Sequence, residues 1–208
     1  GVVTEETIYD RAMRMLALKE DVGLFDDRCP PSVYDSTSHG ALAQRVIDCA
    51  VTLVRDRAPV LPYPLTPATR VLHVVIANGY EERKAAYEGL TRALAQRCSV
   101  ETWVDPGPHK LFERMRDQDV DLVVCSVGAV PTWGISVARL HGPVARNLME
   151  GWMRLGTPVV FVSHFHPFTH LEYDGLMDCV INTYKSLEGT GERVVRGIAG
   201  EAPFSGTL

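Results

Sequence analysis

The chain has 208 residues, of which 46% are apolar, and a formal net charge of −5. This length favours one domain over two, and the apolar content is enough for a sizeable buried core. The modest negative charge argues against a nucleic-acid-binding surface, and no apolar run is long enough to span a bilayer, so we expect neither nucleic acid nor a membrane as a partner. The opening GVVTEETIYD has neither the positive segment nor the apolar core of a signal peptide.

Residues 1–37 are predicted to form a helix and a linker. Thr4 is a suitable N-cap, and Ile8, Ala12 and Met15 recur on one face, which predicts a helix over residues 4–20. Glycine, prolines and short polar residues within 21–37 indicate an extended linker.

A second helix is expected over residues 38–55, at the start of the following domain. Its predicted buried face carries Leu42, Val46, Cys49 and Leu53, which recur at helical spacing. The prolines between positions 59 and 67 exclude a regular element there and predict a connector.

Strands and helices alternate from position 71 onward. Buried strands are expected over residues 71–76, 120–127, 158–163 and 179–183, an edge strand over 100–104, and helices over 82–97, 109–116, 187–199 and from Gly142 onward. Continuous apolar strands with intervening helices predict a mostly parallel sheet with helices on both faces. Residues 38–208 are therefore expected to form a three-layer α/β/α sandwich.

The cysteines are scattered and never spaced as C-x-x-C. They are Cys29, Cys49, Cys98, Cys125 and Cys179. An odd number at irregular spacing, mostly within apolar runs, predicts buried free thiols rather than a disulfide framework or a zinc site.

Ligands of open parallel sheets bind beyond the carboxyl ends of the strands, so any chemistry is expected at residues 77–79, 125–128, 163–166 and 183–185. No dinucleotide-binding glycine motif, P-loop or nucleophile elbow occurs there, and we expect no cofactor. Ser126 and Ser163 are expected to cap backbone groups at strand ends, and Tyr184 to lie in the core.

Three histidines, His164, His166 and His170, follow one predicted buried strand. An H-x-H pair at a strand end can face one metal ion, but no acidic or cysteine ligand lies nearby until Glu172. We therefore expect these imidazoles to line a polar pocket or a domain interface, and we expect no metal site.

Three stretches resemble glycoside hydrolase family 3. Residues 3–26, VTEETIYDRAMRMLALKEDVGLFD, resemble the segment that follows the (β/α)8 barrel in that family, residues 39–62 resemble the next helix, and residues 200–208, GEAPFSGTL, resemble the end of the domain. The resemblance implies the C-terminal α/β domain of a two-domain retaining glycosidase whose nucleophilic aspartate lies on the barrel. Retaining hydrolysis needs that carboxylate, so the isolated chain is expected to be inactive.

The second catalytic group separates two branches of the family that the chain resembles. In the β-glucosidase branch, a glutamate from the loop after the strand matching residues 120–127 is the acid/base. Here no Asp or Glu occurs from Leu122 to Met149. In the β-N-acetylglucosaminidase branch, a His–Asp pair on a barrel loop takes that role, so the missing carboxylate favours this branch. Glu150 and Glu172 remain alternative acids.

This branch implies a scaffold domain that has no catalytic residue and packs on the barrel. Trp133 is expected to stack on a sugar, and His164 and His166 to bond its hydroxyls, with plain interface residues as the alternative. The expected partners are the N-terminal barrel and a β-linked amino sugar. Two other functions stay open: the C-terminal domain of a family 3 β-glucosidase, and a non-catalytic carbohydrate-binding or structural module.

Overall fold

A computed structural model describes residues 3–25, 36–77, 84–116, 119–128, 156–172, 175–185 and 187–207. The chain divides into two compact units, Gly1–Gly40 and Ala41–Leu208. Four predictions lie wholly or mostly outside the described residues: the linker over 21–37, the helix from Gly142, the position of Trp133 and the state of Cys29.

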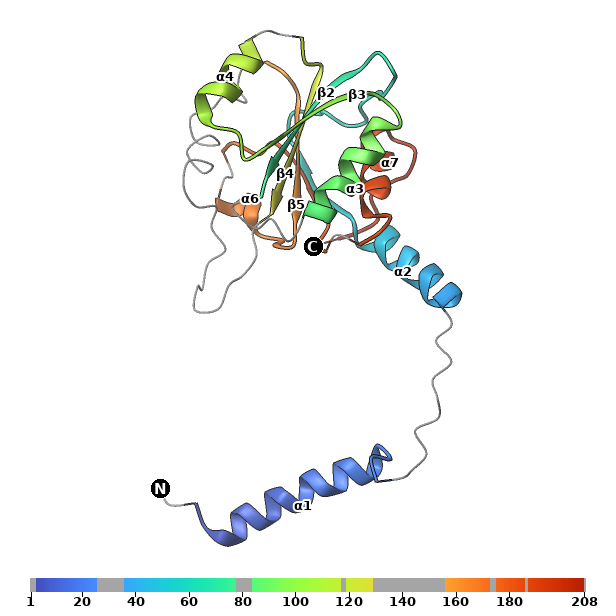
Figure 1. The fold of residues 1–208 in the computed structure, drawn as a ribbon, viewed down its shortest axis with the longest axis vertical. Coiled ribbons are helices and arrows are strands. Elements are labelled where there is room, and N and C mark those ends of the chain that lie inside the picture. The colour runs from blue at the N-terminus through green and yellow to red at the C-terminus, as the bar shows by residue number, and fades with distance from the viewer. Residues whose placement is uncertain are drawn as a thin grey trace. The chain divides into compact units, whose positions relative to one another are not determined.

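The first unit contains helix α1, Glu5–Asp21 (Figure 1). Its first turn is capped by Thr4, whose Oγ1 accepts a hydrogen bond from the amide of Thr7 at 3.3 Å. Its end is closed by Gly23, at φ 71°, and by a bond from the Leu24 amide to the Lys19 carbonyl. The predicted helix is confirmed, and none of its residues is buried.

The second unit is built on a sheet of six strands. They are β1 Thr52–Asp56, β2 Arg70–Ile76, β3 Ser99–Val104, β4 Leu122–Gly128, β5 Val159–His164 and β6 Cys179–Asn182, and their order is β1-β6-β5-β4-β2-β3 (Figure 1). All neighbours pair in parallel except β1 and β6, which are antiparallel. The mostly parallel sheet and the edge position of residues 100–104 are confirmed.

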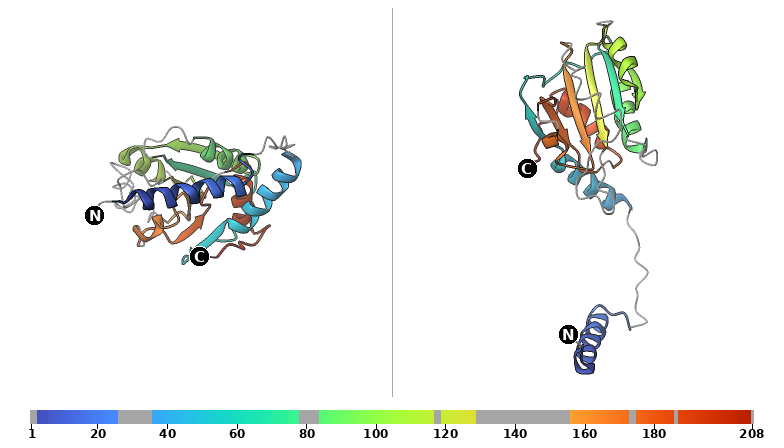
Figure 2. Two further views of the ribbon diagram at one scale, coloured as in Figure 1. Left: turned by 90° about the horizontal axis from the view of Figure 1, so that it is seen from below. Right: turned by 90° about the vertical axis from the view of Figure 1, so that its left-hand side faces the viewer.

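Helices cover both faces of this sheet (Figures 1 and 2). Besides α1, the described helices are α2 Ser36–Ala50, α3 Lys84–Ala95, α4 Pro108–Arg116, α6 Thr169–Glu172 and α7 Thr190–Ile198. Leu90 and Val194 of α3 and α7 share one core with Val71 and Val124, while Leu111 of α4 packs with Val123 on the other face. The predicted three-layer α/β/α sandwich is confirmed.

The prediction for residues 38–55 is wrong in two respects. The helix ends at Ala50, and Thr52–Asp56 forms strand β1 along β6. The predicted buried face is also wrong: Leu42 is 55% exposed, Val46 is 54% exposed, and Cys49 is an exposed thiol. Ile47 and Val51 are buried instead. The residues of β1 make their backbone hydrogen bonds with β6. They include β-branched side chains, which favour strands, but their apolar residues continue the helical spacing and therefore predicted a longer helix.

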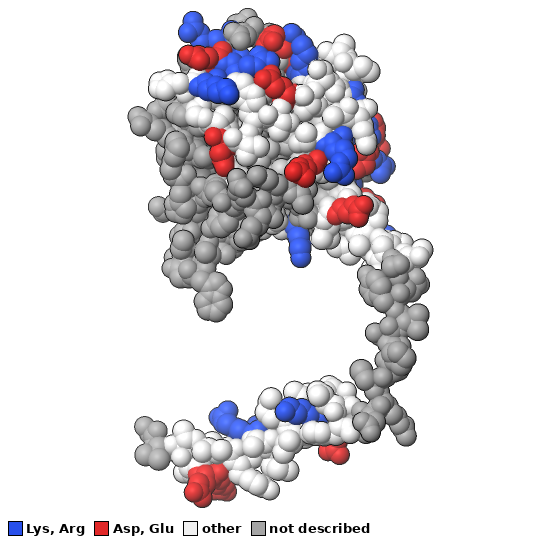
Figure 3. Space-filling model, in the orientation of Figure 1, with Lys and Arg blue, Asp and Glu red and all other residues white. Residues whose placement is uncertain are grey.

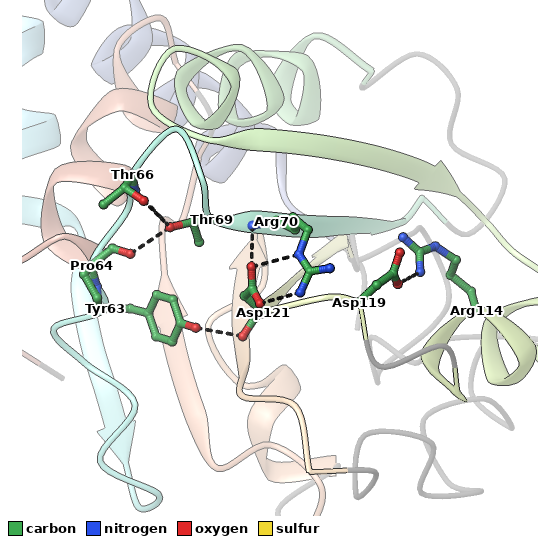
Figure 4. A network of polar contacts seen from close by, with 8 residues as sticks. All are labelled: Tyr63, Pro64, Thr66, Thr69, Arg70, Arg114, Asp119 and Asp121. Carbon is green, nitrogen blue, oxygen red and sulfur yellow. Dashed lines mark hydrogen bonds and ion pairs between the residues drawn. The ribbon is translucent and has the colours of Figure 1, made fainter.

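A polar network links residues at the amino ends of the neighbouring strands β2 and β4 (Figure 4). Arg70 donates from Nε and Nη2 to the two carboxylate oxygens of Asp121, at 3.2 and 2.9 Å, and the hydroxyl of Tyr63 donates to the Asp121 carbonyl at 2.8 Å. Arg114 pairs with Asp119 beside it. The bonds from Arg70 lower the pKa of Asp121 to about 2. Charges of both signs are mixed over this part of the surface (Figure 3), which fits a structural edge.

Candidate functional site

The sheet has a topological switch point between β2 and β4, whose carboxyl ends lie side by side. From β2 the chain continues to β3 on one side, whereas β4 is followed by β5 and β6 on the other. Ligands of open α/β sheets bind beyond the strand ends at such a point. A ligand site is therefore expected at the carboxyl ends of β2 and β4 and of the neighbouring strands β5 and β6.

A row of buried polar side chains crosses the sheet at this point. His73 of β2 has its Nδ1 2.8 Å from the hydroxyl of Thr91 in α3 and its Nε2 2.8 Å from the hydroxyl of Ser126 in β4. The same hydroxyl lies 3.2 Å from Nε2 of His164 at the end of β5, and Nδ1 of His164 lies 3.4 Å from the Thr183 hydroxyl. We call these five residues the polar row. Helix α3, strands β2, β4 and β5, and the residue after β6 are thus joined.

The hydrogen-bond pattern assigns the protons of the polar row. Thr91 donates to the carbonyl of Tyr87 at 3.2 Å, so its oxygen accepts from Nδ1–H of His73. Nε2 of His73 then accepts from Ser126, whose oxygen also lies within hydrogen-bonding distance of Nε2 of His164. Both imidazoles are neutral in this arrangement. Burial lowers the pKa of each to about 3 and keeps them so.

The end of strand β4 leaves room for an aromatic ring beside His164. Tyr87 and His164 meet edge to face, with ring centroids 5.1 Å apart. A Cβ on Gly128 would lie 1.7 Å from the Tyr87 hydroxyl oxygen. Only glycine fits at this position, because the tyrosine occupies the space of any larger side chain.

Strands β5 and β6 both end in a rare backbone turn. After β5, the amide of His166 donates to the carbonyl of His164 across Phe165, whose φ is 72°. After β6, the amide of Lys185 donates to the carbonyl of Thr183 across Tyr184, at φ 58°. A three-residue turn with positive φ at its centre is the strained form of the γ-turn. Such strain persists only where the surroundings enforce it, and it clusters at functional sites.

Buried side chains fasten the turn after β5. Ser163 donates to the carbonyl of His166 at 2.7 Å, Asn182 donates from Nδ2 to the carbonyl of Pro167 at 2.9 Å, and Arg55 donates from Nη2 to the carbonyl of His170 at 3.3 Å. Ser163 is 4% exposed and Asn182 is fully buried. We call residues 165–171 the β5 turn. Side chains from β1, β5 and β6 therefore hold its backbone by hydrogen bonds.

The β5 turn presents an imidazole and a phenyl ring together. The amide of Phe168 donates to Nδ1 of His166 at 3.2 Å, so the proton of the neutral imidazole is on Nε2. The two rings meet edge to face, with centroids 5.7 Å apart at 77°. His166 is half-buried, whereas Phe168 is 56% exposed.

The structure separates the residues singled out by sequence. His166 lies on the turn, but His164 is 2% exposed within the polar row, and Trp133 lies outside the described residues. Ser163 caps a backbone carbonyl as predicted, whereas that prediction is wrong for Ser126, which joins two histidines. Tyr184 is half-buried, not in the core, and its hydroxyl donates to Thr52.

Sequence reasoning missed His73, although it is the one ionisable residue inside an otherwise apolar strand between Val71 and Ile76. That contrast was the available signal. Among the described residues, no three His, Cys, Asp or Glu side chains come close enough together to hold a metal ion. None of the described helices has the length and apolar character of a membrane crossing.

Comparison with known proteins places this fold. No protein-family model matches the chain. It is 29% identical over 223 aligned positions to the "Beta-N-acetylglucosaminidase/beta-glucosidase" of Cellulomonas fimi, and the match covers the whole chain and 39% of that protein. This similarity agrees with the resemblance of the sequence to glycoside hydrolase family 3. It spans about two fifths of this curated relative.

Solved structures share the fold of this chain. The β-glucoside phosphorylase BglX matches 98% of the chain with a TM-score of 0.76 at 20% identity, over 38% of its own length. A fungal multi-domain GH3 β-N-acetylglucosaminidase matches 98% with a TM-score of 0.71 at 18% identity, over 24% of its length. The β-glucosidase of Listeria innocua matches 99% with a TM-score of 0.67 at 20% identity, over 32% of its length. Each match is to part of a longer chain.

Proposed function

We propose that this chain is the C-terminal scaffold domain of a retaining β-N-acetylglucosaminidase, which hydrolyses terminal β-linked N-acetylglucosamine. The observation that carries the proposal is the missing acid in the segment after β4, where no Asp or Glu occurs from Leu122 to Met149. A side chain without a proton to donate cannot be the general acid. The name of the Cellulomonas fimi relative includes this activity together with that of a β-glucosidase.

One carboxylate at the carboxyl ends of the strands has a structural partner. Asp105, directly after β3, accepts a hydrogen bond from the amide of Ala77 at 2.9 Å through Oδ1. It thereby ties the ends of β2 and β3 together. In this proposal, both the nucleophile and the acid come from a (β/α)8 barrel, which is the proposed partner of this domain.

In this proposal, the domain forms one wall of the sugar pocket. His166 donates from Nε2 to a sugar hydroxyl or to the acetamido oxygen, and Trp133 covers a sugar face. The polar row stabilises this wall, because His164, directly before the β5 turn, contacts the hydroxyls of Ser126 and Thr183. Direct contact between His164 and the sugar stays a prediction.

The test is an assay of the full-length protein that contains this chain. We expect turnover of nitrophenyl β-N-acetylglucosaminide at a kcat/KM at least tenfold above that of nitrophenyl β-glucoside, and no turnover by the isolated chain. Each assay is run with and without inorganic phosphate, which separates hydrolysis from phosphorolysis.

Variants of the two alternative acids complete this test. Glu150→Gln and Glu172→Gln should keep most of the activity, since the barrel supplies the acid. Loss of more than a hundredfold in either variant, or turnover by the isolated chain, would contradict the proposal. Preference for the glucoside would point instead to the β-glucosidase alternative, and inactivity on both substrates to a non-catalytic module.

A further inference from the structure

We propose that the outer edge of strand β3 is an interface between two copies of this chain, whose β3 strands pair antiparallel about a two-fold axis at Thr102. Strand β3, Ser99–Val104, is the last strand of the sheet, and among the described strands it pairs with β2 alone (Figure 1). The inference concerns the sheet itself and does not depend on the proposed substrate.

The backbone of β3 offers hydrogen-bonding groups on its outer side. The amides of Ser99 and Asp105, at either end of the strand, donate to the carbonyls of Thr69 and Val75 at 3.0 and 2.8 Å, on the side of β2. Because the direction of the amides alternates along a strand, the amides at positions 100, 102 and 104 point away from β2. Such a row of backbone groups is a template for pairing with another strand.

The two edges of the sheet differ in how they are protected. The register of β1 against β6 shifts between Leu53 and Arg55, and an irregularity of this kind hinders pairing of an edge strand with another chain. Strand β3 runs along β2 from Ser99 to Val104 without a shift and contains no proline. None of its six residues is buried, so the described helices leave this edge open.

The side chains of β3 complement each other when two copies pair about Thr102. Val104, which is 53% exposed, then lies opposite Val100 of the second copy, so that apolar side chains cover each other on one face of the sheet. On the other face, Glu101 lies opposite Trp103 of the second copy. This occupant needs no partner of another kind.

Charge disfavours the neighbouring registers. An axis at Glu101 places the Glu101 carboxylates of the two copies opposite each other, and an axis at Trp103 places Glu101 opposite Asp105. Like charges directly opposite destabilise a strand pair. With the axis at Thr102, Glu101 instead approaches an indole that has the ammonium of Lys110 4.9 Å from its ring centroid. Of these three registers, only the one at Thr102 is free of facing carboxylates.

The experiment is sedimentation velocity of the full-length protein that contains this chain, over a series of concentrations. One short strand edge buries less surface than the roughly 1,200 Å² of a stable complex, so we expect a reversible dimer with a Kd of about 10–100 µM. Thr102→Pro removes the central outward amide but no bond to β2, and should raise Kd at least about tenfold. Thr102→Val keeps the amide and should leave Kd unchanged.

A second pair of variants tests the side chains. Val104→Lys places a charge in the contact and should also raise Kd at least about tenfold. Val46→Lys is the matched control, because Val46 is a valine of almost equal exposure, 54%, on helix α2 away from β3. It should leave Kd unchanged. Thermal unfolding checks that each variant is folded.

Hydrogen exchange locates the interface. Exchange of the amides of Val100, Thr102 and Val104 should slow as the concentration of the wild type rises, and should not change with concentration in Thr102→Pro. A wild type that stays monomeric at millimolar concentration, or a dimer that Thr102→Pro and Val104→Lys do not weaken, would overturn the inference. So would an equal effect from Val46→Lys, or outer amides that are protected in the monomer, since another segment of the same protein would then cover β3.

Discussion

The unusual residues of this domain are two uncharged histidines inside its core. His73 and His164 share the hydroxyl of Ser126, and each has its other ring nitrogen next to a threonine hydroxyl. Buried polar groups are stable only when they are hydrogen-bonded. The serine is the central member, because its hydroxyl lies within hydrogen-bonding distance of both imidazoles.

Ser126→Ala should lower the free energy of unfolding by roughly 2–4 kcal/mol, since it leaves two buried imidazole nitrogens without a partner. Urea denaturation measures this change. Ser205→Ala is the control, because Ser205 is exposed and its hydroxyl makes one bond, to the Asp48 carbonyl at 2.9 Å. That variant should change stability by about 0.5 kcal/mol or less. Similar losses from the two variants would show that the polar row is not a stabilising unit.

At the scale of elements, helices α3 and α7 pack unusually closely. A Cβ on Gly191 of α7 would lie 2.5 Å from the carbonyl carbon and oxygen of Gly89 in α3, whereas a Cβ on Gly89 would meet nothing within 4 Å. The two glycines are therefore not equivalent. The approach of the helices depends on Gly191 alone, because its missing side chain is what lets the backbones meet.

This asymmetry gives a paired prediction. Gly191→Ala should destabilise the domain by roughly 1–3 kcal/mol, since the helices must move apart and the core around Leu90 and Val194 opens. Gly89→Ala should stabilise it by about 0.4–1 kcal/mol, because alanine favours the helix and reduces the freedom of the unfolded chain. Thermal and urea unfolding check both signs. Destabilisation of equal size in both variants would refute the close packing.

The sequence identified most elements but not all of their limits. Period-2 and period-3.6 patterns predicted α1, α3, α4, α7 and the five strands from β2 to β6. Strand β1 was missed, because the residues after Ala50 continue the apolar spacing of the preceding helix. Only the pairing with β6, more than a hundred residues away, makes them a strand.

For the whole molecule, the two histidines make stability depend on pH. Unfolding returns both imidazoles to water, where their pKa is 6.5 rather than about 3. Below pH 6.5 the unfolded chain therefore binds two protons that the native chain does not, and stability falls with falling pH down to about 3. The loss should be roughly 2 kcal/mol for each histidine between pH 7 and pH 5.

Urea denaturation at pH 7, 6 and 5 measures this dependence. In His164→Gln, the change in stability between pH 7 and pH 5 should be about half that of the wild type, whatever the absolute stability of the variant. An unchanged pH dependence in this variant would mean that His164 already binds its proton in the native state.

The sequence by itself determined the alternation of strands and helices, the resemblance to family 3 and the absence of an acid between Leu122 and Met149, because these are local or linear properties. The tertiary structure decided which side chains meet. His73, Ser126 and His164 are 53 and 38 residues apart along the chain, and no local pattern relates them. Parallel pairing of β2, β4 and β5 makes them diagonal neighbours, because Ser126 is aligned with Val75 and Val162, and burial then makes each hydrogen bond between them necessary.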